Sequence, residues 1–169
     1  DNAAMNLTQA QTEQLVSQIV TRLVERERRV HALLLPQLRA GLDPSVFVHY
    51  ATLHLMLPDL AFIHRLAQFD TTCPAVAALN EAWSWGMKVH ISLHRQLLAA
   101  LPCAALHSLP LSFSDSQGVA IRLHAGKVLS YRDIATLDPG WLLIASHTLV
   151  TPLAQDTVSA RHIQLLRQE

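Results

Sequence analysis

Hydrophobic and polar positions near the start of the chain alternate with the period of an amphipathic helix. Between residues 15 and 29 the sequence reads LVSQIVTRLVERERR, and its apolar residues recur at short intervals until the chain enters a charged block. At 100° per residue these side chains fall within an arc of about 180°. Thr8 and Gln11 have the spacing of a capping box that would start the helix. The six residues of this apolar face are Leu15, Val16, Ile19, Val20, Leu23 and Val24.

The apolar face has two interpretations, which periodicity alone does not separate. An isolated helix of fewer than about 20 residues is marginal in water, so this face needs a surface to lie against. In one interpretation the helix packs on its own domain. In the other it docks into a groove on another protein, as amphipathic segments do.

After residue 30, strand-like and helix-like segments alternate along the chain. In order, they are a short apolar run at 30–35, a strand at 46–57, a helix opened by Pro58, a helix at 73–86 opened by Pro74 and capped by Gly86, a strand at 88–93, and a short helix at 94–102. Proline in the first helical turn and glycine just past the last one are typical helix boundaries. The alternation of strands and helices indicates a parallel sheet with helical crossovers.

The last third of the chain has shorter units. Residues 109–126 predict a hairpin with DSQG as its turn, and 142–146 predict another strand. Two tandem units then repeat one device, a strand, a capping residue and a helix. Ser130 and Asp133 form the first cap, while Thr151 with Pro152 forms the second. The sequence therefore predicts one compact α/β domain over 30–169, with a mostly parallel sheet and a hairpin in its final third, preceded by the helix and charged segment at 8–29.

Composition and charge indicate a folded domain and argue against two classes of partner. The chain has 169 residues, of which 50% are hydrophobic and 15% are charged, so a folded domain is expected. Thirteen basic residues balance thirteen acidic ones and form no basic stripe, which argues against a nucleic-acid partner. No apolar run reaches the roughly 18 residues of a membrane span. We expect no membrane partner either.

The start of the chain and its cysteines indicate a cytoplasmic protein. The N-terminal segment is not expected to be a signal peptide, because its apolar residues are spaced apart instead of forming a block. Asp1, Asn2 and Ala3 have the look of an expression remnant, Met5 is the expected native start, and 1–7 is expected to lie outside the fold. Cys73 and Cys103 match no metal-ligand spacing and are expected to be reduced and buried.

Binding loops for phosphate groups are missing from the sequence. The five glycines are Gly41, Gly86, Gly118, Gly126 and Gly140, and no two lie within three residues of each other. A loop that cradles phosphate needs clustered glycines, so that backbone N–H groups can approach the ligand closely. We therefore expect no nucleotide cofactor.

The ten histidines do not form a convincing metal site. His90 and His94 have the four-residue spacing of helical ligands, but they fall at the junction of a predicted strand and helix, without a third ligand nearby. His49 and His54 differ by an odd number and would face opposite sides of one strand. We expect no bound metal.

No pair of residues suggests catalysis. The capping box accounts for Ser130 and Asp133, which leaves Tyr131 and Arg132 as exposed residues of a first helical turn. Trp83 and Trp85 could stack on a flat ligand, although core packing explains them more simply. Without an acid–base pair, we expect a protein that is not an enzyme.

Four segments resemble a known family. SLHRQLLAALP, LPLSFSDSQG, LHAGKVLSYRD and VTPLAQDTVSARHIQLLRQE occur in this order and are similar to the PduM family of the bacterial propanediol-utilisation microcompartment. The resemblance spans essentially the whole chain and is densest after residue 91. GKVLSYRD and IQLLRQE are its most specific pieces.

The resemblance implies a structural component needed to assemble a shell-enclosed organelle, with no assigned reaction. The first helix also resembles the short terminal segments that dock cargo proteins on the inside of such shells, and ERERR would then be the polar linker. On this interpretation the six apolar residues bind a shell or core protein, and the protein lies in the cytoplasm, within or at the shell.

An alternative of a different class stays open. Flavodoxin-like folds bind flavin through plain Ser/Thr loops, so the α/β domain could instead belong to an accessory enzyme that binds a flavin or nucleotide. The sequence names neither the partner nor the oligomeric state.

Overall fold

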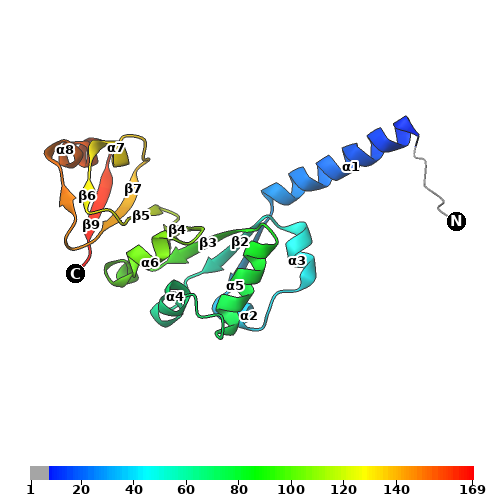
Figure 1. Ribbon diagram of the computed structural model, residues 1–169, viewed down its shortest axis with the longest axis horizontal. Coiled ribbons are helices and arrows are strands. Elements are labelled where there is room, and N and C mark those ends of the chain that lie inside the picture. The colour runs from blue at the N-terminus through cyan, green and yellow to red at the C-terminus, as the bar shows by residue number, and fades with distance from the viewer. Residues whose placement is uncertain (1–7) are drawn as a thin grey trace.

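Seven strands form one continuous sheet in the computed structural model, which describes residues 8–169 (Figure 1). In sheet order they are β1 (Val30–Leu34), β2 (Thr52–Met56), β3 (Lys88–Leu93), β4 (Leu111–Asp115), β5 (Ala120–His124), β7 (Gly140–Ile144) and β9 (Ile163–Arg167). All neighbours are parallel except β4 and β5, which form the expected hairpin. The single α/β domain with a mostly parallel sheet is thus confirmed. The expectations for residues 1–7 lie outside the described residues.

One long helix precedes the first strand, and shorter helices lie between the later strands. In chain order the helices are α1 (Gln9–Arg28), α2 (Leu35–Arg39), α3 (Pro44–His49), α4 (Leu60–Ala67), α5 (Pro74–Ser84), the 3₁₀ helix η1 (Arg95–Ala100), α6 (Cys103–His107), α7 (Tyr131–Ile134) and α8 (Pro152–Ala160). Two further strands, β6 (Val128–Leu129) and β8 (Leu149–Val150), pair in parallel outside the main sheet. Within residues 8–169, no helix is both long and apolar enough to cross a membrane.

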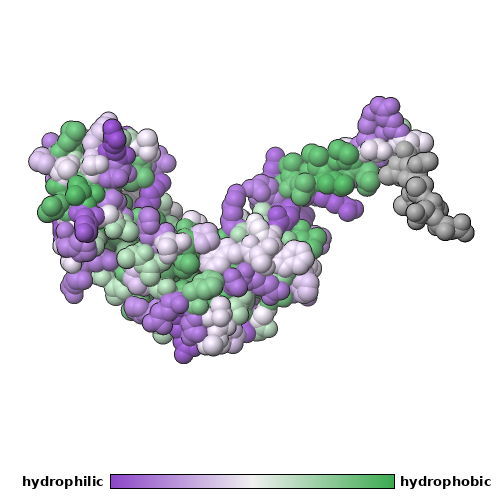
Figure 2. Space-filling view, in the orientation of Figure 1, coloured by the Kyte–Doolittle hydropathy of each residue, from purple (hydrophilic) through white to green (hydrophobic). Residues whose placement is uncertain are grey.

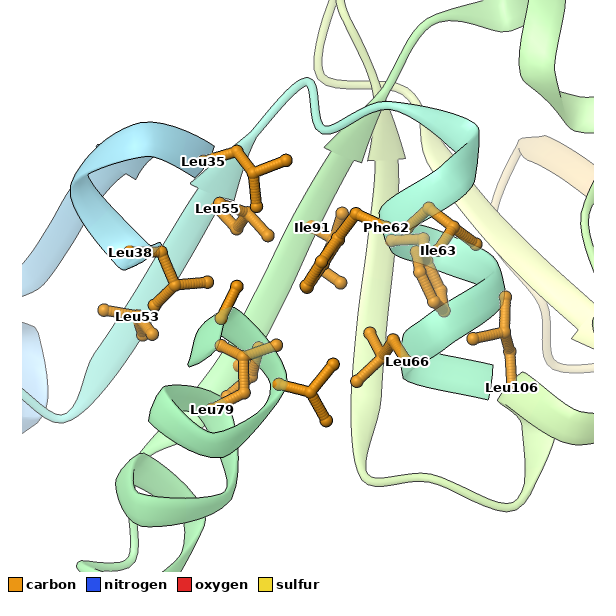
Figure 3. Close-up of a cluster of buried hydrophobic side chains, with 14 of the residues drawn as sticks. Leu35, Leu38, Leu53, Leu55, Phe62, Ile63, Leu66, Leu79, Ile91 and Leu106 are labelled. Carbon is orange, nitrogen blue, oxygen red and sulfur yellow. The ribbon is translucent and has the colours of Figure 1, made fainter. Parts of the chain in front are cut away.

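The main core lies on one face of strands β1 to β4. Side chains alternate between the faces of a strand, and the register places Leu53 of β2 beside Val89 of β3, and Leu55 beside Ile91. Helices α2, α4, α5 and α6 cover this face, as Figure 3 shows. Its fully buried members include Leu38, Leu53, Leu55, Ile63, Leu66, Leu79, Ile91 and Leu106.

The second half of the sheet is covered from the opposite side. Leu142 and Ile144 of β7 belong to a smaller core with Val158 of α8 and Ile134 of α7, whereas Leu143 points to the main core. The covering helices therefore change face between β4 and β7. In Figure 1, α7 and α8 stand at the far end of the molecule from α1.

This change of side leaves the other face of β1 to β4 without a covering helix among residues 8–169. We call it the open face. Its members are Val30, Ala32, Leu34, Thr52, His54, Met56, Lys88, His90, Ser92, Ser112 and Ser114. Parallel sheets are normally buried on both faces, so an open face is unusual for this fold.

Three element boundaries differ from the sequence prediction. Residues 46–57 do not form one strand, because Asp43 caps α3 by accepting a hydrogen bond from Ser45, and β2 begins only at Thr52. Pro58 does not open the next helix, since Asp59 caps it one residue later. Residues 94–102 form the 3₁₀ helix η1, and α6 follows after Pro102.

Other local predictions are confirmed. Gly86 and Gly118 adopt positive φ angles of 75° and 83°, as a helix cap and a hairpin turn require. Thr151 caps α8 by accepting from the backbone N–H of Ala154 at 3.2 Å. Cys73 and Cys103 are free and buried, and burial raises the pKa of the Cys103 thiol to about 11.

Candidate partner-binding site

Helix α1 forms as its sequence predicts, with both halves of its capping box. The backbone N–H of Gln11 donates to the Thr8 hydroxyl at 3.2 Å, and the Thr8 N–H donates to the Gln11 side chain at 2.9 Å. No residue of α1 is buried. Its six apolar residues are between 46% and 57% exposed, and they form the hydrophobic stretch along the projecting arm in Figure 2.

The C-terminal end of α1 is fixed to the domain by a set of polar contacts that we call the helix base. Arg26 donates to the carbonyl oxygens of Phe47 at 3.2 Å and Trp85 at 3.3 Å. Glu27 pairs with Lys88 at 2.7 Å. This side-chain hydrogen bond lowers the pKa of Glu27 below its ordinary value. The helix is therefore anchored at its base while its apolar face stays exposed.

The arrangement suits recognition of a protein surface. Half-exposed aliphatic side chains in one stripe gain free energy when a partner removes them from water. Helices that bind in grooves use side chains with this spacing. Of the two interpretations of the sequence, packing of α1 on its own domain is wrong for this structure. Binding of a partner by Leu15, Val16, Ile19, Val20, Leu23 and Val24 stays a prediction.

The structure brings together a different pair of histidines from those weighed in the sequence. His54 and His90 occupy paired positions on β2 and β3, and their ring centroids are 5.0 Å apart in an edge-to-face arrangement. His90 bridges the hydroxyls of Ser112 at 2.7 Å and Ser114 at 2.8 Å. His94 is the N-cap residue of η1, and His49 ends α3.

The His54–His90 pair lies in a hollow of about 410 Å³ on the open face. Burial lowers the pKa of both imidazoles below the ordinary value, and the neighbouring His54 lowers that of His90 further. Within the part of the chain that the structure describes, the Nε2 atom of His54 is buried and has no hydrogen-bond partner. Among residues 8–169 there is no cluster of three or more potential metal ligands.

A second polar cluster centres on Asp115, at the end of β4. Its side chain is fully buried. It accepts hydrogen bonds from the N–H groups of Gln117 and Val119, the indole of Trp141 at 3.2 Å and the guanidinium of Arg95 at 3.0 Å. Burial alone would raise the pKa of Asp115, but these four donors together hold it below its ordinary value. From the sequence, Asp115 is expected only as part of the DSQG turn.

The remaining candidates have structural roles. The Asp133 carboxylate accepts from the N–H and the hydroxyl of Ser130, and Tyr131 and Arg132 are exposed, as expected. Trp83 donates to the Pro110 carbonyl oxygen. Trp85 is 55% exposed and stacks on Phe47, so core packing does not describe it.

A crevice of about 540 Å³ lies where β5 diverges from β4. Its lining includes His90 and Ser112 on one side and Arg122 and Leu123 on the other. Cavities that bind small molecules have similar volumes. The crevice is the feature that an accessory enzyme of the alternative class would use.

The fold and the site together define an α/β protein that presents an amphipathic helix outside its sheet. The model of a family described as "Putative propanediol utilisation" matches residues 14–164 of the chain. The match spans most of the sequence, and the protein belongs to this family. No solved structure matches the chain significantly.

Two curated relatives carry the name "Bacterial microcompartment assembly protein PduM". The protein from Salmonella typhimurium is 40% identical to this chain, and that from Citrobacter freundii is 38% identical. Each alignment covers 157 residues, which is 93% of this chain and 96% of the relative. The resemblance found in the sequence is thereby confirmed.

Proposed function

We propose that this protein is a non-catalytic assembly component of the propanediol-utilisation bacterial microcompartment, and that α1 links it to a shell or core protein. The single observation that carries the proposal is the exposed apolar face of α1. The names of the two relatives support the organelle and the assembly role. The protein would then lie in the cytoplasm, within or at the shell.

The exposure of α1 is costly unless a partner covers it. Burying an aliphatic side chain contributes about 1.5 to 3 kcal/mol, and six of them would exceed the stability margin of many domains. The chain forgoes this gain within its own fold, because the helix base holds α1 away from the core. An assembly partner with an apolar groove would recover it.

Substitutions on α1 test the proposal. Ile19→Glu and Leu23→Glu place charge in the centre of the apolar face, where an unpaired charge in a groove would cost several kcal/mol. Gln14→Glu and Gln18→Glu, on the opposite side of the same helix, are the matched controls. The readouts are co-localisation with microcompartments in cells and pull-down against individual shell and core proteins.

The first pair of variants should lose both signals while the domain stays folded by circular dichroism, and the controls should keep them. If Ile19→Glu and Leu23→Glu still reach the microcompartment, α1 is not the link.

The crevice between β4 and β5 supports the alternative of a flavin- or nucleotide-binding accessory enzyme. A visible spectrum with bound flavin, or saturable flavin binding at micromolar concentration, would favour that alternative.

A further inference from the structure

Within residues 8–169, two complementary apolar surfaces are left uncovered. One is the apolar face of α1. The other is the part of the open face on β1 and β2, where Val30 is 52% and Leu34 is 49% exposed beside Ala32 and Met56. A helix with one apolar face and an uncovered parallel sheet are the two parts of an α/β layer.

The two surfaces cannot meet within one copy. Only Arg29 separates the end of α1 from the start of β1, and its backbone is extended, with φ −89° and ψ 131°. Connections between a helix and a strand that pack on each other usually need about 2 to 6 residues to reverse direction. The helix base adds further contacts that hold α1 in its projecting orientation. Figure 1 shows the helix leaving the sheet.

The surfaces match in length. From Leu15 to Val24 the apolar face advances nine residues, or roughly 14 Å at about 1.5 Å per residue. A five-residue strand such as β1 or β2 is roughly 16 Å long at about 3.3 Å per residue. A helix aligned with the strands would thus place its whole apolar face on the open face.

The area is sufficient if two copies exchange helices. An aliphatic side chain presents roughly 60–120 Å² of apolar surface. With six such side chains about half exposed, an equal area covered on the sheet, and two helices exchanged, the buried area is on the order of 700–1,400 Å². Stable interfaces begin at about 1,000 Å², so one helix alone would not suffice but a reciprocal exchange can.

We propose that two copies of this chain form a closed dimer in which α1 of each copy packs on the open face of the other. Reciprocal exchange closes with two-fold symmetry and leaves neither surface free. The inference deepens the proposed function, and one consequence rests on that function. Because both partners use the apolar face of α1, a microcompartment protein that binds α1 must displace the second copy.

The first test is the oligomeric state of the purified full chain, measured by light scattering after size exclusion. We expect a dimer for the parent protein and a monomer for both Ile19→Glu and Ala32→Glu, which place charge on the helix and on the sheet side of the contact. The controls Gln18→Glu and Ala105→Glu, at exposed positions elsewhere, should stay dimeric. A monomeric parent protein across the micromolar range would overturn the proposal.

A second variant separates helix exchange from simple pairing of two α1 helices. Inserting a flexible five-residue Gly/Ser segment after Arg29 would let α1 fold back on its own open face, where its effective concentration is far higher than that of a second copy. We expect this variant to become monomeric. If it stays dimeric, the exchanged arrangement is wrong.

The two proposals can fail separately. Ala32→Glu leaves α1 intact, so it should abolish the dimer and keep co-localisation with microcompartments. Loss of co-localisation in Ile19→Glu without any dimer in the parent protein would reject helix exchange alone. A parent dimer whose α1 variants still co-localise would reject the proposed link alone.

Discussion

At the scale of single residues, the Asp115 carboxylate joins three separate parts of the fold. Its donors come from the β4–β5 turn, from Arg95 of η1 and from Trp141 of β7. The Arg95 guanidinium also lies 5.8 Å from the centre of the Trp141 ring, within the range of a cation–π contact. One carboxylate therefore links the half of the sheet that carries the main core to the half covered by α7 and α8.

Asp115→Asn should lower the free energy of unfolding by about 1 to 3 kcal/mol, because an amide replaces a buried carboxylate and leaves some of its hydrogen-bond donors without a partner. Urea unfolding measures the loss. Asp156→Asn, at an exposed position on α8, is the control and should change stability by less than about 0.5 kcal/mol. Equal effects of the two substitutions would show that the Asp115 cluster does not stabilise the fold.

The His54–His90 pair makes stability depend on pH near neutrality. Both folded imidazoles have a pKa below the ordinary 6.5, so the unfolded chain binds these protons more tightly than the folded chain. Their contribution is complete above pH 6.5 and declines as the pH falls toward the folded pKa values. Urea midpoints at pH 7.5 and 5.5 should therefore differ more in the parent protein than in a His54→Gln, His90→Gln double variant.

At the scale of elements, capping residues decide where helices begin. Thr151→Ala removes the side-chain cap of α8 and should cost about 1 kcal/mol in denaturant unfolding. Ser159→Ala is the matched control, since the Ser159 hydroxyl donates to the Gln155 carbonyl oxygen inside the same helix and does not cap it. No difference between the two variants would mean that the Thr151 cap contributes nothing to stability.

Elements with local signals could be predicted from the sequence, and those set by tertiary structure could not. The units capped by Ser130 and Thr151 follow from short-range chemistry and form as predicted. The apolar, β-branched composition of 46–57 favoured a strand, but the Asp43–Pro44 start of α3 outweighs it. This signal was present in the sequence and was missed.

The residues of the candidate site also divide into those that local sequence predicts and those that depend on tertiary structure. The amphipathic period reveals the six residues of α1, because a helix face depends only on spacing. The His54–His90 pair could not be predicted, since it depends on which strands pair and in which register. The partners of Asp115 come from positions as distant as Arg95 and Trp141, and spacing along the chain says nothing about them.

At the scale of the whole molecule, α1 and the sheet domain should be separable. A chain lacking residues 1–25 keeps Arg26 and Glu27 of the helix base and loses no residue of either core. At low protein concentration, where copies are separate, it should have the same thermal midpoint as the full chain. Differential scanning fluorimetry over a range of concentrations measures both chains.

The same measurement over a range of concentrations also distinguishes a chain that associates through α1 from one that does not. Because association stabilises the folded state by mass action, the midpoint of the full chain should rise with concentration, whereas that of the truncated chain should stay constant. Aggregation of the truncated chain at every concentration would show that α1 is needed for the domain to fold.

The single residue between α1 and β1 also fixes the rotation of α1 about its own axis relative to the sheet. With no flexible joint and with Arg26 and Glu27 bonded to the domain, the direction of the apolar face is fixed relative to the strands. One extra residue inside α1, before Arg26, would turn that face by about 100°, whereas seven would nearly restore it while moving it about 10 Å outward. If α1 links the protein to a partner as proposed, the length and rotation of the helix would set both the distance of that partner from the sheet and the direction in which it faces.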